Sequence, residues 1–147
     1  MRRTRRSTCP KEAHLFDRLS AYAPQALAVL RIVTALLFIE HGTQKLFGFP
    51  VPGMGTPEGI FLLAGILETF GGLLILVGFL TRPVALVLSG MMAVAYFMVH
   101  FPQNFWPVGN GGDAAALFSF VFLYLVFAGP GDWAIDTRAR TRGTVRA

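Results

Sequence analysis

Four apolar stretches fill most of this 147-residue chain, and each is long enough or nearly long enough to cross a lipid bilayer. They run from about residue 24 to 47, 59 to 80, 83 to 101 and 113 to 128. The last stretch is the shortest, near the lower limit of the roughly 17–25 residues that a crossing helix needs. In hydrocarbon a single segment can bond its own backbone groups only as a helix. The sequence therefore predicts an all-α integral membrane protein built as a four-helix bundle.

Composition supports a membrane protein and argues against binding of nucleic acid. The chain is 54% hydrophobic and only 14% charged, whereas soluble domains carry about a quarter charged residues. Most of the positive charge lies in the two tails, 1–22 and 129–147, without the interleaved aromatic residues of a nucleic-acid surface. The single cysteine, Cys9, excludes a disulfide framework within one chain.

The distribution of basic residues predicts the orientation of the chain. The tails and the turn at Arg82 carry Arg and Lys residues, whereas segments 48–59 and 102–112 carry none. Positive-inside counting then places both termini in the cytoplasm and the two neutral loops outside. We expect a retained basic tail (1–22), a membrane domain (23–128) and a second basic tail (129–147). No cleaved secretory signal is expected, because no cleavage site follows the first apolar run.

Ionisable residues inside the apolar stretches are the main functional signal. Burying such groups costs several kcal/mol each unless they find partners. At about 1.5 Å per residue, Glu40 lies roughly 10 Å and Glu68 roughly 13 Å below the outer ends of their helices. Other polar residues are expected at or above this level: His41, Gln44, Lys45, His100, Asn104, Asn110 and Asp113. The sequence therefore predicts a polar site in the outer half of the bundle, with Asp113 also capping the fourth helix.

Small residues predict where the helices pack closely. Ala64, Glu68 and Gly72 are spaced i, i+4, i+8, which would turn Glu68 toward a partner helix. The third and fourth stretches offer similar faces through Ser89 and Ala93, and through Ala115 and Ser119. Helix packing alone is a sufficient explanation for these small residues.

Several short motifs resemble those of the DoxX family of bacterial membrane proteins. The resemblance covers roughly residues 30–136 and is carried, in order, by Glu40-His41-Gly42-Thr43-Gln44-Lys45-Leu46-Phe47-Gly48, Glu68-x-x-Gly71-Gly72, Gly78-x-x-Thr81-Arg82, His100 to Asp113 and Gly129-Pro130-Gly131-x-x-x-x-Asp136. Asp113 departs from the pattern, because family members often carry Glu there. The resemblance implies an inner-membrane four-helix bundle with a loose link to redox chemistry, including thiosulfate:quinone oxidoreduction and partner redox enzymes.

Each candidate residue has a functional and a structural interpretation. Glu40, His41 and Glu68 are the expected proton-handling or catalytic groups, and Gln44, Lys45, His100, Asn110 and Asp113 are expected to bind a cofactor. The alternative is that the acids are neutralised structurally by Lys45, His41 or Arg31. Lys45 could instead reach the outer interface, and Arg31 could reach the cytoplasmic headgroups or bond a backbone carbonyl.

Two function classes remain open from the sequence. The first is a redox membrane subunit that binds a quinone and receives electrons from another protein. The sequence leaves open whether the chain itself catalyses a reaction. A haem held by His41 and His100 is less compatible, because the two differ in height by about a helical turn. The second is a non-catalytic scaffold or assembly factor for a redox complex, with the lipid bilayer, partner subunits or further copies of itself as partners.

Overall fold

The computed structural model describes residues 18–53 and 57–144, and within these ranges the chain is helical without strands. Three helical segments are long and apolar enough to cross a membrane: α2 (Ala23–Phe47), the composite helix Gly59–Val77 and the composite helix Thr81–His100. A fourth apolar helix, α7 (Asp113–Ala128), has 16 residues. The predicted all-helical membrane fold is therefore confirmed, with three helices of clear spanning length and one shorter apolar helix.

The helix ends follow local chemistry. α2 carries a proline in its first turn, where the missing N–H costs no hydrogen bond. The composite helix Gly59–Val77 ends at Gly78, which has a φ of 68° that side chains rarely adopt. The next helix begins at Thr81, two residues before the predicted start at Pro83. The turn therefore lies at residues 78–80, so that Arg82, which the sequence placed in the turn, lies in the first turn of α5.

Two of the crossing helices contain a π-helical segment. The second is built from α3 (Gly59–Ile66), η1 (Leu67–Gly71) and α4 (Gly72–Val77). The third is built from α5 (Thr81–Ala95) and η2 (Tyr96–His100). Such wide turns are rare and are frequent at functional sites.

The segment η1 alters the predicted small-residue stripe. Glu68 and Gly72 are buried as expected, but Gly65 is buried in place of the half-buried Ala64. The i, i+4, i+8 pattern assumes 3.6 residues per turn, and a π-turn shifts the register within the stripe. Because of this shift, Glu68 and Thr69 both face the protein interior.

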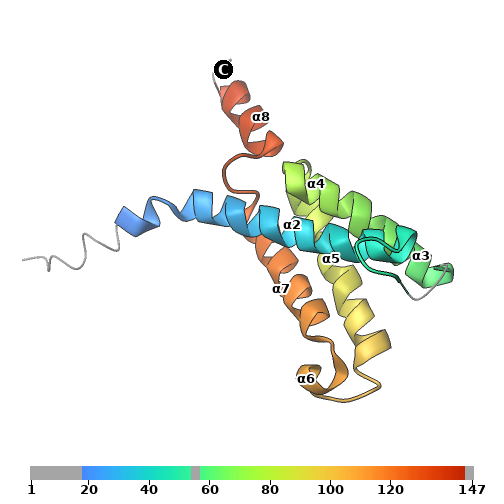
Figure 1. Cartoon of the computed structure of the whole chain (residues 1–147). Coiled ribbons are helices and arrows are strands. Elements are labelled where there is room, and N and C mark those ends of the chain that lie inside the picture. Colours follow the sequence, from blue (N-terminus) through green and yellow to red (C-terminus); the bar gives the residue numbers. More distant parts are fainter. Residues whose placement is uncertain (1–17, 54–56, 145–147) are drawn as a thin grey trace, which may run out of the picture.

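The helices pack as two pairs. α2 lies along α3, η1 and α4, and α5 lies along α7. Figure 1 shows the pairs meeting near α4 and diverging from there, so that α3 and α6 (Pro107–Asn110) lie far apart. The Phe38 ring of α2 joins the pairs by packing edge-on against Phe118 and Phe122 of α7, at centroid distances of 5.2 and 4.8 Å.

The pair α5 and α7 is held by the small residues that the sequence singled out. The Ser89 hydroxyl donates to the Ser119 carbonyl at 2.9 Å, and the Ser119 hydroxyl donates to the Ser89 carbonyl at 3.1 Å. Ala115 is buried beside them. The predicted close-packing face is therefore confirmed.

The outer surface of the helices is apolar, as a surface in contact with lipid requires. Large hydrophobic side chains on all four helices are exposed, including Leu37, Phe70, Val87 and Phe120.

The C-terminal segment, expected as a simple basic tail, forms a helix, α8 (Ile135–Thr144). The remainder of the N-terminal tail, 1–17, lies outside the described residues.

Candidate functional site

Lys45 of α2 and Glu68 of η1 form an ion pair within the membrane domain. The Lys45 ammonium donates to both carboxylate oxygens of Glu68, with a distance of 2.6 Å to Oε1. The Glu68 side chain is only 4% exposed, whereas that of Lys45 is 32% exposed. Glu68 is thus buried, and its partner Lys45 is partly exposed at the surface. Of the interpretations of Lys45 that the sequence left open, pairing with Glu68 is confirmed.

The direction of the side chains explains how residues at different depths meet. Helical side chains tilt toward the N-terminus of their own helix. α2 and the composite helix Gly59–Val77 run in opposite directions. The Lys45 side chain therefore tilts toward the middle of the membrane domain, and the Glu68 side chain tilts toward Lys45. The helices also approach closely, since a Cβ on Gly42 would strike the Thr69 side chain and its backbone nitrogen.

The neighbours of this ion pair on α2 face two different ways. His41 lies one turn before Lys45 on the same side of the helix, and its ring is 5.7 Å from that of Phe118. Glu40 is exposed on the opposite side, and Gln44 is half-buried between the two faces. The carboxyl groups of Glu40 and Glu68, both expected to handle protons, are therefore turned apart by the helix.

The residues after the third crossing helix form a separate cluster. The His100 imidazole is 3.0 Å from the Asn110 carbonyl and stacks on Tyr96. The Asn110 side chain is buried; its amide donates to Asn104 and its oxygen accepts from the Gly112 N–H. These bonds organise the segment around α6, which the sequence indicated only as a neutral loop. His100 and Asn110 make no contact with the Lys45–Glu68 pair among the described residues.

The predicted cap of the fourth helix is wrong. Gly112 occupies the N-cap position of α7, and no side chain caps this end. Asp113 is exposed in the first turn, where its charge can still favour the positive end of the helix dipole. The Asn110 side chain holds Gly112 in place and so takes over the ordering role that had been expected of Asp113.

A second set of charged residues lies at the opposite end of the helices. The guanidinium of Arg31 is fully buried and donates to five backbone carbonyls. Two of these end α4 and three belong to the segment before α8: Ile75, Leu76, Pro130, Asp132 and Trp133. A cation at a helix C-terminus satisfies carbonyls that have no partner within the helix. Bonding of Arg31 to backbone carbonyls, one of the two interpretations from sequence, is confirmed.

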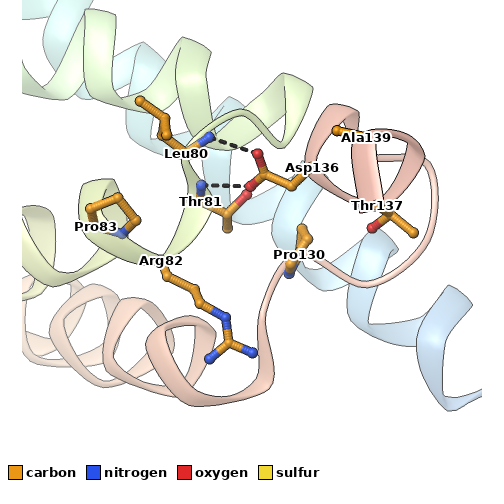
Figure 2. Close-up of a pocket in the computed structure, with 8 residues that line it drawn as sticks. All are labelled: Leu80, Thr81, Arg82, Pro83, Pro130, Asp136, Thr137 and Ala139. Carbon is orange, nitrogen blue, oxygen red and sulfur yellow. Dashed lines mark hydrogen bonds between the residues drawn. The ribbon is translucent and has the colours of Figure 1, made fainter. Parts of the chain in front are cut away.

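Asp136 of α8 binds the start of α5, at the same end of the helices as Arg31. Its carboxylate accepts from the Leu80 N–H at 2.9 Å and the Thr81 N–H at 2.8 Å, as Figure 2 shows. Partial burial raises the pKa of Asp136, but the bonds from Thr81 and Leu80 and the charge of Arg31 lower it by more, to below its usual 3.8. The contact fixes a strained turn, since Leu80 has a φ of 49°. An open hollow of about 550 Å³ lies beside it, with Arg82 on its wall.

Comparison with known proteins places this architecture in a family. The profile of the DoxX family matches residues 26–101, slightly more than half of the chain. The chain belongs to the DoxX family. An uncharacterized protein of Haemophilus influenzae is 42% identical over 83% of this chain and 96% of its own length. The inner membrane proteins YqjF and YphA of Escherichia coli are 35% and 27% identical, over 74% and 84% of this chain and 87% and 96% of their own lengths. No solved structure matches.

The structure gives physical roles to several DoxX motif residues. In the first motif, Gly42 permits the close crossing of α2 and η1, and Lys45 binds Glu68. In the turn Gly78-x-x-Thr81-Arg82, a Cβ on Gly78 would strike Ala134, and the Gly78 carbonyl accepts from the Asp136 N–H at 3.0 Å. The motif around Asp136 lies outside the region matched by the DoxX profile, yet it packs directly on the matched turn.

Sequence reasoning missed the contacts made by Asp136 and Arg82, because both join distant parts of this DoxX chain. The signal for Asp136 was its place in a motif, without any indication of its partner. Arg82 was assigned to topology alone, but its guanidinium donates to the Val126 carbonyl at the end of α7 at 2.7 Å. Among residues 18–53 and 57–139, no three His, Cys, Asp or Glu side chains are arranged to hold a metal ion.

Proposed function

We propose that this DoxX protein is a membrane subunit of a quinone-linked redox system, in which Lys45, Glu68 and His41 handle protons. The observation that carries the proposal is the Lys45–Glu68 pair. A carboxylate that is 4% exposed lies within a membrane-crossing helix and is joined to the surface by a partly exposed ammonium. Ionisable groups at such depth are costly and are associated with proton and ligand sites.

The side chains near this pair have the chemistry that a quinone headgroup requires. A quinone has two carbonyl oxygens that accept hydrogen bonds and a flat ring that packs against aromatic groups. The Lys45 ammonium and the His41 imidazole are donors on one side of α2, and Phe118 packs beside His41. These residues are therefore compatible with a quinone, with Lys45 and His41 as the groups that would hold it.

The chain's own contribution would be to bind the headgroup and to move protons. A bound quinone takes up two electrons and two protons to become a quinol. Protons from the outer side of the membrane would pass to the quinone through His41 and through Glu68, which would take up each proton before donating it and then return to the carboxylate form that Lys45 stabilises. The electrons would come from a partner redox enzyme, since the one cysteine of the chain, Cys9, offers no dithiol.

The proposal is tested by purifying the protein in mild detergent with its native lipids and extracting bound quinone. We expect about one quinone per binding site in the wild type, lost in Glu68→Gln while the helix content and unfolding temperature survive. Glu58→Gln is the matched control, because Glu58 is an exposed carboxylate at the N-cap of α3, and it should retain the quinone. Protein without quinone, which also binds none when quinone is added, would refute the redox role.

A scaffold function is the second candidate, and the position of Glu40 favours it. This carboxyl group faces away from the rest of the chain within a crossing helix, where a bound partner would cover it. In Glu68→Gln, a scaffold and a redox subunit would both keep their partners, but only the redox subunit would lose activity. Co-purification from native membranes followed by an activity assay on the complex separates the two.

The proposed topology has four crossings with both termini in the cytoplasm. It rests on the basic residues at the Arg31 end of the helices, on the neutral loops at the other end and on the apolar character of α7. Reporter fusions after residues 53, 81, 109 and 147 would test it. We expect periplasmic signals at 53 and 109 and cytoplasmic signals at 81 and 147; a periplasmic signal at 147 would exclude α7 as a crossing helix.

A further inference from the structure

The outward face of α2 carries a carboxyl group for which the described residues provide no partner. At 100° per residue, Glu40 lies about 170° from the centre of the buried face of α2. The Glu40 side chain is exposed and makes no hydrogen bond or ion pair with any described residue. Its neighbours on this face are the exposed side chains of Val33, Leu36 and Leu37.

This position is unfavourable for a single copy in a bilayer. Glu40 lies roughly 10 Å below the outer end of α2, among side chains suited to lipid. Polar groups on crossing helices usually face a protein interior or a partner, because hydrocarbon offers them no hydrogen bonds. The face around Glu40 is therefore expected to be covered by a surface with a polar group within reach of the carboxyl group.

The spacing on this face indicates that the covering element is a helix. The outward residues of α2 alternate steps of four and three: Val29, Val33, Leu36, Glu40, Thr43 and Phe47. All except the half-buried Thr43 are exposed. This is the heptad pattern by which two helices cross at a small left-handed angle, and a polar residue within such a seam fixes its register.

A second copy of the chain provides both the matching pattern and the missing partner. Two copies insert in the same direction, so their α2 helices are parallel and related by a two-fold axis along the membrane normal. Gln44 lies one turn beyond Glu40, is half-buried and has no side-chain hydrogen bond among the described residues. Its amide can both donate and accept, so it can bind a carboxyl group in either protonation state.

We propose that the chain forms a two-fold homodimer through the outward face of α2, in which Glu40 of each copy hydrogen-bonds Gln44 of the other. The heptad seam provides the apolar contact, and the two Glu40–Gln44 bonds fix the register. The proposal does not depend on the redox function, since Lys45 and Glu68 lie on the opposite side of α2.

Disulfide cross-linking in native membranes tests which surface pairs. Single cysteines are placed at Val33→Cys and Leu36→Cys in a Cys9→Ser background and are oxidised with a copper catalyst. Val94→Cys is the matched control, because Val94 is exposed at a similar distance along α5. We expect dimers from the two α2 variants and none from the control. Equal cross-linking at Val94, cross-links only to a different protein, or no cross-linking at all would overturn the homodimer.

The role of the polar bond is tested by the mass of the purified protein in detergent across a dilution series. Glu40→Gln retains hydrogen bonding and should remain dimeric. Glu40→Leu should raise the dimer dissociation constant about tenfold, since two interhelical bonds are lost. Leucine suits a lipid-facing position, so the unfolding temperature should not fall. Gln44→Leu should have the same effect, and combining it with Glu40→Leu should add nothing further. A dissociation constant unchanged by Glu40→Leu would overturn the Glu40–Gln44 bond.

Discussion

Replacing Arg31 by methionine is expected to destabilise this protein more than any other single change at the ends of its helices. Methionine has a similar length and no hydrogen-bond donor. It would leave five carbonyls without the guanidinium that now binds them, two at the end of α4 and three in the segment 130–133. Because Arg31 is fully buried, water cannot replace these bonds without opening the helix ends.

The magnitude follows from two opposing contributions. A hydrogen bond to a charged group contributes about 1.5–3 kcal/mol, so five such bonds give a gross stabilisation of roughly 7–15 kcal/mol. Burial of the guanidinium costs several kcal/mol of lost hydration. Removing one member of a buried charged arrangement typically costs about 3–5 kcal/mol, and we expect Arg31→Met to fall in this range. Arg31→Lys should lose about half as much, because an ammonium has three donors and no planar fork.

The assay is thermal unfolding of the purified protein in one detergent. On the scale of soluble domains of this size, about 3–5 kcal/mol lowers the unfolding temperature by roughly 6–20 °C. Arg82→Met is the matched control, since Arg82 is exposed and among the described residues its guanidinium binds one carbonyl, that of Val126; its effect should stay within about 1 kcal/mol. Trypsin cleavage at Arg138 should also become faster in Arg31→Met. Equal unfolding temperatures for the two variants would refute the reasoning.

Two further predictions concern helix contacts. Gly42→Ala should destabilise the protein by about 1–3 kcal/mol, because the new methyl group would strike Thr69. Gly90→Ala on the open surface of α5 should be neutral or slightly stabilising in the same unfolding assay, and equal losses would contradict the close-approach argument. Asp136→Asn should destabilise the protein at neutral pH by about 1 kcal/mol, through the weakened cap of α5. The pKa of Asp136 is lower in the folded protein, so the carboxylate contributes fully above its ordinary pKa of 3.8, and the contribution is lost as pH falls through the lowered value. The difference between wild type and Asp136→Asn should therefore disappear at strongly acidic pH, and a difference that persists there would contradict the role of the charge.

The sequence predicted the helices well, because hydrocarbon imposes a strong constraint on each segment separately. Apolar runs and glycine or proline boundaries located the four helices to within about three residues. The burial of Glu68 also followed from spacing alone, as did the small-residue faces on which Ser89 and Ser119 lie. These features depend on residues close in the chain, where helical geometry fixes the relative positions.

Contacts between distant segments could not be predicted in the same way. The polar residues were expected to converge in one outer site, but His100 binds the Asn110 carbonyl and Glu40 faces outward. Position along a helix follows from the sequence, but which side chains meet also depends on the rotation of each helix about its axis, which tertiary packing decides. The π-turn η1 also escaped detection, since its five residues carry no compositional signal that separates them from α-helix.

The two ends of the helices are held in physically different ways, and this difference bears on function. At the Arg31 end, three charged side chains bind the ends of α4, α5 and α7. Arg31 joins α2 and α4 to the segment before α8, Asp136 joins α8 to the start of α5, and Arg82 joins α5 to α7. At the other end the two helix pairs diverge (Figure 1), and the Lys45–Glu68 pair links only α2 to η1. Structural change on binding is drawn from the less constrained parts of a protein. The ligand and the second copy proposed above would bind at this less constrained end, so they could move one helix pair against the other without breaking the contacts at the Arg31 end.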